Sequence, residues 1–430
     1  MSNRTEPIRS VKGTRDLLPP DTHLWQRVEA EAHRVFAAYH YGEIRTPILE
    51  ETALFARGVG AETDIVMKEM FTFNDRGDES LTLRPEATAS VVRAYIEHSL
   101  YNLGGIQKLY YIGPMFRRER PQKGRYRQFY QIGAEILGSQ NALVDVEIIE
   151  MLVLFLRRVG IREYQLLINS VGCPKCRTEY LDVLRDALEA VKSTMCVDCQ
   201  RRAETNPLRV LDCKVGADQP IIEKLPKIID HLDPECREHF ARVTSGLEAR
   251  SIEYQVTPRL VRGLDYYTRT TFEITSGALG AQNAVVGGGR YDGLSEMLGG
   301  PPTPGIGFSI GQDRLLLAVQ SAGILKPEAH LAAYVVWMGD AALAAASQLV
   351  RDLRAQGLSV EIDYDPAKIK KAMGVANKLQ ARFAIIIGDG ELASGKYQVK
   401  DMAGGEQSEL EPSAIAEYLI GGEREIRSSG

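Results

Sequence analysis

A loop rich in arginine lies between two apolar stretches in the first third of the chain. Residues 108–112 and 128–136 have the composition of strands, and Pro121 and Gly124 bend the segment between them. The basic residues of that segment are Arg117, Arg118, Arg120, Lys123, Arg125 and Arg127. Because a guanidinium group pairs bidentately with phosphate oxygens, a hairpin with several of them suits a polyphosphate or the end of a nucleic acid. The charge alone fits a solvated hairpin tip equally well.

The second of these stretches also carries polar residues at alternate positions. Side chains alternate between the two faces of a strand, so Gln131, Gly133 and Glu135 should share one face. A carboxylate accepts hydrogen bonds but cannot donate them. Glu135 could therefore bind an ammonium or an N–H group of a ligand.

Two further runs combine polar residues with sharp turns. Arg-Pro-Glu-Ala-Thr at 84–88 precedes a predicted helix, where Glu86 could complement the positive helix N-terminus or bind a ligand. Arg262, for which the sequence shows no obvious partner, precedes Asp-Tyr-Tyr at 265–267. That run fits either an aromatic turn into a strand or the wall of a pocket.

Glycine-rich segments follow later in the chain. The glycines at 287–289 and those at 305, 307 and 311 allow backbone to approach a ligand or a neighbouring strand closely. The latter spacing, Gly-x-Gly-x-x-x-Gly, differs from the dinucleotide fingerprint, and the chain has no Gly-x-x-x-x-Gly-Lys-Ser/Thr loop. These patterns argue against a Rossmann or P-loop nucleotide site.

The composition bounds the type of protein. The 430 residues should form two or three domains, and 44% hydrophobic residues suffice for a sizeable core. With a formal net charge of −5, an RNA partner would have to be held by local basic patches. No apolar run approaches the roughly 20 residues that span a bilayer, and residues 1–9 lack the apolar centre of a secretion signal. We expect a cytoplasmic protein without membrane contact.

Four of the six cysteines form two pairs, Cys173-x-x-Cys176 and Cys196-x-x-Cys199. Their spacing fits a four-cysteine zinc site. However, a straight helix of about 15 residues between them would hold the pairs roughly 22 Å apart. We therefore expect reduced structural thiols and no resident metal ion. His231 and His239 have no partner at ligand spacing, so we expect both at the surface.

Hydrophobic periodicity predicts the elements that position these residues. In the first part they are a helix from about residue 21 to Gly42, an extended segment at 43–50, a hairpin at 71–83, helices at 89–98 and 142–159, a strand at 164–169 and helices within 171–250. After a looser segment at 320–331, strands are expected at 332–338, 358–364, 383–388 and 396–401, with helices at 340–356, 366–381 and 412–420. This alternation predicts a small α/β domain.

The polar runs together resemble a known family. Phe116-Arg117-x-Glu119, a basic loop and a returning strand resemble motif 2 of the class II aminoacyl-tRNA synthetases, and residues 120–129 resemble the histidyl-tRNA synthetases in particular. The runs at 84–88, 260–274 and 285–294 are similar to further motifs of that family, and 305–314 is similar to motif 3. Ala87 and Asp313 replace the family's frequent glycine and glutamate.

The resemblance implies roles for residues around ATP. Arg117 and Arg262 would act at the α-phosphate as the catalytic residues. Arg125 would bind the terminal phosphates, and Phe129 and Arg314 would sandwich the adenine. The resemblance also implies that Mg²⁺ bridges the phosphates.

The remaining implied roles concern histidine and tRNA. The residues of the histidine site would be Glu86, Thr88, Arg117, Gln131, Glu135, Arg262, Tyr266 and Tyr267, of which Glu86, Thr88 and Gln131 hold the ammonium group. Glu135 and Tyr267 would bind the imidazole. The acceptor end of tRNA would contact Arg120, Gln122 and Arg127.

The resemblance further implies an α+β fold. A six-stranded antiparallel class II catalytic core at 1–325, with a helical insertion at 171–250, would precede an α/β anticodon-binding domain at 330–421 and a flexible tail at 422–430. The activity would be that of a ligase that joins L-histidine to ATP as histidyl-adenylate and transfers it to the 3′ end of tRNA(His). The segment ending at Pro47 resembles motif 1, which implies a homodimer.

The alternative is a regulatory protein. A synthetase-like relative is the regulatory subunit of ATP phosphoribosyltransferase, and it typically lacks the anticodon domain and the catalytic arginines. Arg117, Arg262 and Arg314 are all present in this chain, and the sequence continues well beyond motif 3. These features favour the ligase.

Overall fold

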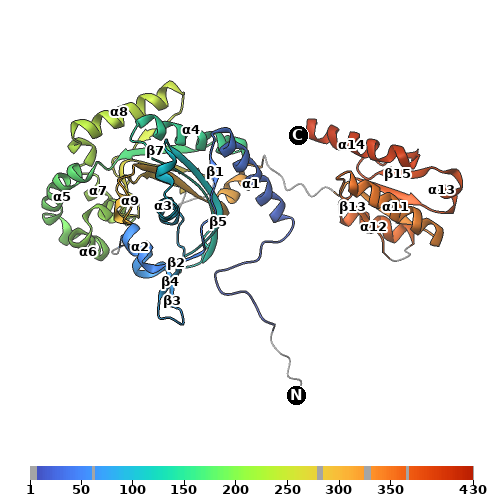
Figure 1. Ribbon diagram of the computed structural model, residues 1–430, viewed down its shortest axis with the longest axis horizontal. Coiled ribbons are helices and arrows are strands. Elements are labelled where there is room, and N and C mark those ends of the chain that lie inside the picture. Colours follow the sequence, from blue (N-terminus) through green and yellow to red (C-terminus); the bar gives the residue numbers. More distant parts are fainter. Residues whose placement is uncertain (1–6, 61–62, 278–283, 324–330, 365–367, 430) are drawn as a thin grey trace, which may run out of the picture. The chain divides into compact units, whose positions relative to one another are not determined.

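The chain divides into two units, and each is described on its own (Figure 1). The computed structural model describes residues 7–60, 63–277, 284–323, 331–364 and 368–429, with side chains up to residue 421. The first unit is Met1–Lys326 and the second is Pro327–Gly430. The sequence predicts the junction between residues 325 and 330, which lie outside the described residues.

An eight-stranded sheet forms the centre of the first unit, in the order β1-β5-β6-β11-β10-β9-β7-β8. Its strands are β1 Gly42–Glu43, β5 Gln107–Phe116, β6 Gln128–Leu137, β7 Gln165–Ser170, β8 Gln255–Val256, β9 Thr268–Thr275, β10 Ala284–Arg290 and β11 Gly305–Gly311. Neighbours from β5 to β7 are all antiparallel, which confirms the predicted six-stranded core. The two-residue strands β1 and β8 pair in parallel at its edges.

A separate three-stranded sheet has the order β2-β4-β3. Its strands are β2 Leu49–Glu51, β3 Phe71–Asn74 and β4 Ser80–Leu83. The predicted hairpin is confirmed, and Asp75 Oδ1 closes its turn by accepting hydrogen bonds from the N–H groups of Gly77 at 2.7 Å and Glu79 at 3.0 Å. The extended segment predicted at 43–50 is divided between β1 and β2, because Pro47 in the middle has no N–H to donate to a sheet.

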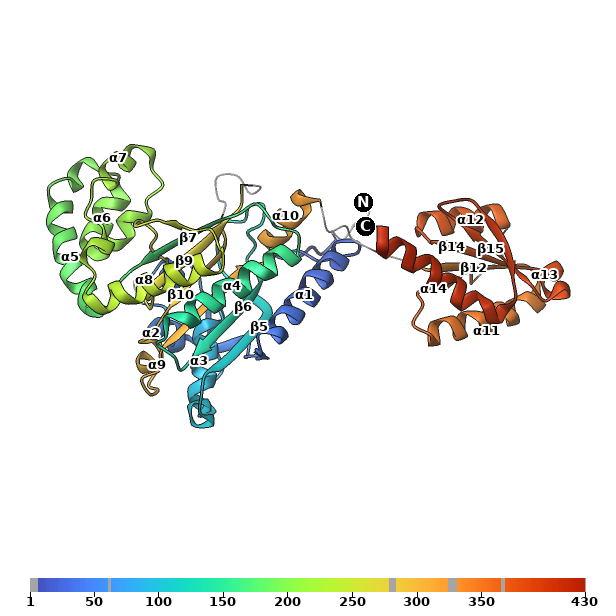
Figure 2. The same cartoon turned by 90° about the horizontal axis from the view of Figure 1, so that it is seen from above.

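Helices cover one face of the central sheet. They are α1 Asp21–Ala38, α4 Ala142–Arg158, α8 Pro234–Ala249 and α10 Gln312–Ala322. Figure 2 shows α8 running beside α4. Ile132 of β6 and Phe308 of β11 point into this core. Because side chains alternate, Gln131 and Glu135 face the other side, as predicted.

The other side of the sheet carries α3 Thr88–Glu97, which confirms the helix predicted at 89–98. The short helices α2 Thr52–Gly58 and α9 Leu294–Met297 pack against α3. The five-residue helix η1 Ile65–Glu69 and the turn η2 Leu100–Leu103 complete this part of the unit. The N-terminus of α3 therefore lies close to the polar residues of β6, since Thr88 Oγ1 donates to Glu135 Oε1 at 2.8 Å.

A helical insertion follows β7, as predicted for residues 171–250. Its elements are α5 Pro174–Glu189, η3 Lys192–Thr194, α6 Val197–Thr205, η4 Pro207–Asp212, η5 Gly216–Asp218, α7 Gln219–Ile222, η6 Ile228–His231 and α8. One apolar face of α5 is buried, with Tyr180, Leu184 and Leu188 each fully inaccessible to solvent. These side chains belong to one apolar cluster that also contains Ala87 and Val91 beside the sheet, so the insertion packs against the rest of the unit.

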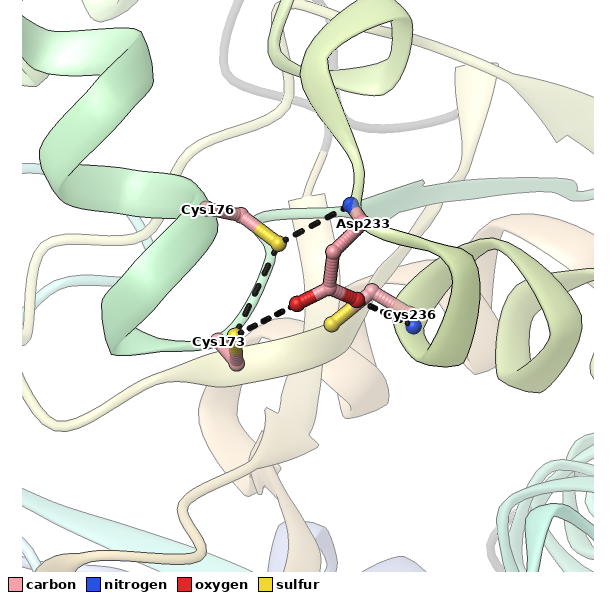
Figure 3. Close-up of side chains that lie close together, drawn as sticks. All are labelled: Cys173, Cys176, Asp233 and Cys236. Atoms are coloured by element: carbon pink, nitrogen blue, oxygen red, sulfur yellow. Dashed lines mark hydrogen bonds between the residues drawn. The ribbon is translucent and has the colours of Figure 1, made fainter.

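The two cysteine pairs lie at the N-terminal ends of α5 and α6 and do not meet. Cys173 and Cys176 group with Asp233 and Cys236 (Figure 3). The other pair, Cys196 and Cys199, groups with Cys213 and Asp218. One four-cysteine site is therefore not formed, in agreement with the helix-length argument. The sequence did not reveal that each pair has a third cysteine and an aspartate beside it.

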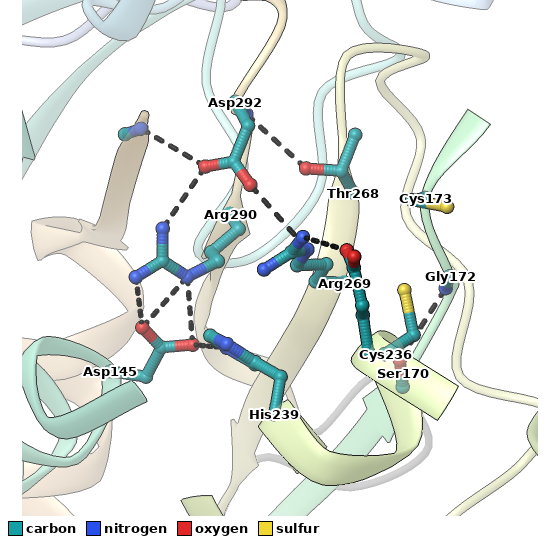
Figure 4. A network of polar contacts seen from close by, with 12 residues as sticks. Asp145, Ser170, Gly172, Cys173, Cys236, His239, Thr268, Arg269, Arg290 and Asp292 are labelled. Atoms are coloured by element: carbon teal, nitrogen blue, oxygen red, sulfur yellow. Dashed lines mark hydrogen bonds and ion pairs between the residues drawn. The ribbon is translucent and has the colours of Figure 1, made fainter. Parts of the chain in front are cut away.

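A buried ion network joins the insertion to the sheet (Figure 4). Arg290 of β10 is fully buried and pairs with Asp145 of α4 at 2.7 Å and with Asp292 at 3.0 Å. His239 of α8 lies 2.9 Å from Asp145 through its Nε2 atom. The prediction that His239 is a surface residue is therefore wrong, because its partner lies 94 residues away in the sequence. His231 is half-buried against the ring of Tyr180.

The second unit is a five-stranded sheet in the order β13-β12-β14-β15-β16, with helices. Its elements are β12 Ala333–Trp337, α11 Asp340–Ala355, β13 Val360–Ile362, α12 Ile369–Lys378, β14 Phe383–Ile387, α13 Asp389–Ser394, β15 Tyr397–Asp401, β16 Gln407–Leu410 and α14 Pro412–Ser429. These confirm the predicted alternation. The start of the helix predicted at 366–381 lies outside the described residues.

Residues 422–429, which the sequence analysis assigns to a flexible tail, belong to the last turns of α14. Among the described residues, no helix is both long enough and apolar enough to cross a membrane.

Candidate active site

The arginine loop leaves the sheet between β5 and β6. The hairpin register runs from Gln107 opposite Leu137 to Phe116 opposite Gln128. Beyond it, the N–H of Arg117 donates to the carbonyl of Arg127 at 2.9 Å. The N–H of Arg127 donates to the carbonyl of Gly13 at 2.7 Å. The loop is therefore held against the N-terminal lead-in and is not a free hairpin tip.

Glu119 organises two guanidinium groups of this loop. Its Oε2 atom lies 3.0 Å from Arg125 Nη1, and its Oε1 atom lies 3.8 Å from Arg117 Nη1. Arg117 Nε donates to the carbonyl of Pro85 at 2.8 Å, and its guanidinium carbon lies 5.3 Å from the ring centroid of Phe129. These contacts fix Arg117 between the N-terminal end of α3 and the face of β6.

A cavity of about 260 Å³ opens between this loop, α3 and the segment around Arg262. The residues predicted to bind histidine and ATP all line this cavity, with one exception. Those that line it are Glu86, Thr88, Arg117, Arg125, Phe129, Gln131, Arg262, Tyr266, Tyr267 and Arg314. The exception is Glu135, which lies behind the cavity wall.

Glu135 is completely buried on β6. Its carboxyl group accepts hydrogen bonds from Tyr291 Oη at 2.7 Å, Thr88 Oγ1 at 2.8 Å and Tyr111 Oη at 3.4 Å. Burial raises the pKa of Glu135 to about 8, although these hydroxyl groups oppose the shift. Room for the side chain exists because residue 307 is glycine, where a Cβ atom would lie 1.6 Å from Glu135 Oε2.

Glu86 caps the start of α3. Its Oε2 atom accepts a hydrogen bond from the N–H of Thr88 at 2.7 Å, and Oε1 accepts one from Ala89 at 2.9 Å. Glu86 can therefore both complement the helix N-terminus and bind a ligand. It lines the cavity, and each of its oxygens has a second lone pair. Burial raises the pKa of Glu86, although the backbone N–H groups of Ala89 and Thr88 oppose the shift.

Gln131 lies on the same face of β6 and also lines the cavity. Within the described part of the chain, its Oε1 atom is a buried acceptor without a hydrogen-bond donor. A buried acceptor that lacks a donor is costly unless a ligand or water supplies one. Gln131 and Glu86 thus mark a place for a group that donates hydrogen bonds.

Arg262 has a partner that the sequence did not suggest. Its Nη1 atom lies 2.5 Å from Glu273 Oε2 on β9. The guanidinium group crosses β10 at Gly287, where a Cβ atom would lie 1.7 Å from Arg262 Nη2. Any side chain at residue 287 would therefore displace Arg262 from the cavity.

The residues predicted to contact tRNA lie outside the cavity. Arg120 and Gln122 are exposed at the far end of the loop. Arg127 is half-buried, and its Cγ and Cδ atoms would each lie 2.9 Å from a Cβ atom at Gly13. Arg127 therefore lies against the lead-in, whereas the other two face solvent.

Tyr291 and Glu119 line the cavity but were not predicted as site residues. Alternation along β10 puts residue 291 on the same face as Gly287 and Gly289, so this pattern could have identified Tyr291. Glu119 is the glutamate of the Phe-Arg-x-Glu run. Its pairing with Arg117 and Arg125 could not be read from the sequence, because it depends on how the loop folds back.

Sequence comparisons decide the family. The family profile "Histidyl-tRNA synthetase" matches residues 13–315, and "Anticodon binding domain" matches residues 332–421. The chain belongs to the histidyl-tRNA synthetase family. It is 60% identical over 413 residues to a histidine–tRNA ligase of Solibacter usitatus, covering 96% of this chain and 99% of the relative. A histidine–tRNA ligase of Koribacter versatilis is 56% identical over 423 residues, with 96% of each covered.

Solved structures agree with this membership of the histidyl-tRNA synthetase family. The apo histidyl-tRNA synthetase of S. aureus matches with a TM-score of 0.81 and 41% identity, covering 96% of this chain and all of that one. A protein from Bacillus halodurans described as an ATP phosphoribosyltransferase regulatory subunit/histidyl-tRNA synthetase has a TM-score of 0.65 at 22% identity, which shows a shared fold only. The regulatory alternative is not favoured.

Proposed function

We infer that the reaction of this family, the ATP-dependent joining of histidine to tRNA, takes place in the cavity beside β6. The observation that carries this inference is that acceptors for an ammonium group and four arginines line the same cavity. In the first step the histidine carboxylate attacks the α-phosphate of ATP, which gives histidyl-adenylate and releases pyrophosphate. The histidyl group then moves to the terminal ribose of tRNA.

The ammonium group of histidine is assigned to Glu86, Thr88 and Gln131. The free acceptor atom of Gln131 and the remaining lone pairs of Glu86 supply the hydrogen-bond acceptors that an ammonium group needs. This position leaves the substrate carboxylate facing Arg117 and Arg262. The carboxylate is thereby held where it can attack phosphorus.

ATP is assigned to the arginine side of the cavity. Arg117 and Arg262 are placed at the α-phosphate and Arg125 at the terminal phosphates. Phe129 and Arg314, both on the cavity wall, enclose the adenine. Neither step requires a nucleophile from the protein, since such transfer depends on positioning and on neutralising developing negative charge.

Magnesium fits this arrangement through Glu119. Mg²⁺ prefers oxygen ligands and is usually held by one or two carboxylates together with substrate phosphates. Glu119 lines the cavity between the two arginines that would bind phosphate groups. When bound, the ion would neutralise phosphate charge, and Glu119 would hold it there.

The imidazole is assigned to the end of the cavity formed by Tyr266, Tyr267 and Tyr291. Tyr291 Oη donates to Glu135, so its lone pairs face the substrate and can accept an imidazole N–H. Glu135 then acts on the imidazole through Tyr291. This differs from the direct contact that the sequence predicted, because Glu135 does not line the cavity.

Glu135→Gln should change both the affinity for histidine and the pH dependence of the protein's stability, and the two effects can be measured separately. Glu135 is protonated below about pH 8, so the substitution alters a neutral hydrogen bond, which is worth about 0.5–1.5 kcal/mol. KM for histidine should therefore rise roughly two- to tenfold, with KM for ATP little changed. The folded protein holds a proton on Glu135 up to about pH 8, whereas the unfolded chain loses it near its ordinary value of 4.5. The wild type should therefore lose about 1.4 kcal/mol of stability per pH unit between these values, relative to the glutamine variant.

Denaturant unfolding at pH 5 and pH 8, with exchange kinetics, measures both effects. Substitution of the exposed Glu179 by glutamine is the control and should show neither. A stability difference between wild type and Glu135→Gln that does not depend on pH would refute the raised pKa. Equal losses for histidine and ATP would mean that Glu135 supports the hairpin and does not act on the imidazole.

The acceptor end of tRNA is assigned to Arg120 and Gln122, because both are exposed to solvent in the basic loop. Arg127, the third predicted residue, would support the loop from the lead-in side. The second unit matches the anticodon-binding domain and is assigned to the anticodon of tRNA(His). We expect the protein to work in the cytoplasm.

Histidine-dependent ATP–pyrophosphate exchange tests the whole assignment. Exchange that requires histidine, followed by charging of tRNA(His), is the expected result. A purified, folded chain that binds histidine but catalyses no exchange would support the regulatory alternative instead.

We also expect a homodimer, in which the segment near Pro47 and the small sheet meet a second copy. Ile48 and Leu49 are each 41% exposed and Phe73 is 47% exposed, which gives this edge an apolar surface. Leu49→Lys should shift the protein from dimer to monomer in sedimentation velocity at micromolar concentration. Val183→Lys, at a similarly exposed position on α5, should leave the dimer intact. A wild-type monomer with full activity would contradict this prediction.

A further inference from the structure

All six cysteines of the chain lie in two compact clusters of the helical insertion. Each cluster contains three cysteines and one aspartate, and the four potential ligand atoms of each lie within 4.8 Å of one another. The family's reaction assigns no task to either cluster. Both lie outside the residues that line the cavity.

The first cluster joins the start of α5 to the start of α8 (Figure 3). Cys173 Sγ lies 3.6 Å from Cys176 Sγ and 3.3 Å from Asp233 Oδ2. The N–H of Asp233 donates to Cys176 Sγ at 3.2 Å. Cys236 enters from the first turn of α8, where its N–H donates to Asp233 Oδ1 at 2.8 Å. Cys176 and Cys236 are each only 1% exposed.

The second cluster joins the start of α6 to the loop that follows η4. Cys196 Sγ lies 3.9 Å from Cys213 Sγ, and Cys213 Sγ lies 3.3 Å from Asp218 Oδ2. The N–H of Val215 donates to Cys213 Sγ at 3.4 Å. Cys199, Cys213 and Asp218 are all buried. The two clusters therefore have the same ligand set although they share no residue.

The spacing fits a single tetrahedral ion. Zinc–sulfur bonds of about 2.3 Å in a tetrahedron place neighbouring sulfurs about 3.8 Å apart, close to the 3.6 and 3.9 Å observed. A disulfide bond would need a sulfur–sulfur distance of about 2.05 Å, and it would leave the third cysteine of each cluster unpaired. An iron–sulfur cluster, in which each thiolate binds a different iron atom, would need a wider cage.

Hydrogen bonds to sulfur support the same interpretation. Backbone N–H groups point at one sulfur in each cluster, at Cys176 and at Cys213. Such bonds stabilise the thiolate form, which is the form that binds metal. Simple apolar burial of thiols would need neither these donors nor a carboxylate within each cluster.

We propose that the insertion holds two structural zinc ions, one bound by Cys173, Cys176, Cys236 and Asp233 and one by Cys196, Cys199, Cys213 and Asp218. The first ion fastens the start of α5 to the start of α8, and the second fastens the start of α6 to the segment that follows η4. The insertion gains stability from such links, because metal binding contributes directly to folding. The expectation of thiols without metal is thereby revised.

The insertion also contacts the backbone of the proposed histidine site. Arg177, next to Cys176, donates hydrogen bonds to the carbonyls of Asp265 at 3.5 Å and of Tyr267. Arg209, on η4 just before Cys213, donates to the carbonyl of Arg262 at 3.3 Å. Loosening the insertion should therefore disturb the segment 262–267, and KM for histidine should rise when the metal is lost. This consequence rests on the proposed function, whereas the metal sites do not.

Metal content of the full-length protein, purified without chelator, is the direct test. Elemental analysis should find two zinc ions per chain. Cys236→Ser and Cys213→Ser should each leave one, and the double variant should leave none. Asp230→Asn and Asp198→Asn, which alter exposed aspartates close to the clusters, should keep both ions. Wild-type protein without zinc, which also fails to bind added ZnCl₂ after reduction, would overturn the proposal.

Cobalt binding covers the case in which a cysteine variant does not fold. Reduced wild-type protein, stripped with a chelator, should bind CoCl₂ and develop thiolate-to-cobalt absorption that saturates at two equivalents. Spectra typical of six-coordinate cobalt, or no sulfur-to-metal band, would exclude the sites. Metal binding with no change in KM for histidine between loaded and stripped protein would keep the sites but refute their link to the cavity.

Discussion

Arg262→Ala should lower the rate of histidine-dependent ATP–pyrophosphate exchange by about 10²–10³-fold, the usual effect of removing one group that stabilises charge in a transition state. Arg262 is held by Glu273 at 2.5 Å and crosses the sheet over Gly287 into the cavity. Affinity for tRNA should be largely unchanged, because the loop residues assigned to tRNA are elsewhere. Exchange at saturating histidine and ATP, with a tRNA binding assay, measures both quantities.

Two companions make this test specific. Arg262→Lys keeps the charge but loses the planar fork, so it should recover only part of the rate. Glu273→Gln should reduce the rate less than Arg262→Ala, since Glu273 positions the arginine and does not line the cavity. A near-normal exchange rate in Arg262→Ala would remove this residue from the mechanism.

Arg290→Met should destabilise the first unit by about 3–5 kcal/mol, the cost of removing one partner from a buried ion pair. The guanidinium group of Arg290 is fully buried and also donates to the carbonyls of Ser139 at 3.0 Å and Asn141 at 3.2 Å. Burial alone would raise the pKa of Asp145, yet Arg290 and His239 hold it below its usual value. Without Arg290, the buried Asp145 carboxyl group would lose the partner that offsets most of the effect of its burial and would keep only His239 beside it.

Tryptophan fluorescence can follow this unfolding. The chain has two tryptophans, Trp25 in the first unit and Trp337 in the second, so a Trp337→Phe background reports on the first unit alone. Arg242→Met, which alters a 68% exposed arginine of α8, should change stability by no more than about 0.5 kcal/mol. Adding Asp145→Leu to Arg290→Met should restore part of the loss. Similar small effects at residues 242 and 290 would show that the network contributes little.

The sequence predicted the parts of this protein that depend on local order. The hairpin of β5 and β6, the face shared by Gln131 and Glu135, and the helices α3 and α4 all follow from alternation and periodicity. The resemblance of short runs to family motifs then assigned most of the cavity residues to one site, although Glu86 and Arg314 are far apart in the sequence. These predictions succeeded because each motif lies at the end of a strand or helix whose position the fold determines.

Contacts between distant segments could not be predicted in this way. His239 was expected at the surface, but Asp145 meets it from a helix 94 residues away. Cys213 and Cys236 lie outside the two cysteine pairs, and only the folding of the insertion brings them beside those pairs. Glu135 was expected in the cavity, but the hydroxyl groups of Thr88 and Tyr291 lie between it and the open space. In each case tertiary packing determines which residues meet, and hydrophobic periodicity in the sequence does not predict such packing.

The glycines at 287 and 307 have a consequence for inhibitor design. They create room for Arg262 and Glu135 by the absence of side chains, so this part of the cavity does not depend on a loop moving aside. A ligand that enters a preformed site loses less free energy to rearrangement of the protein. A rigid histidine analogue, with its amine and imidazole locked at the spacing between Gln131 and Tyr291, should therefore gain affinity over its flexible counterpart.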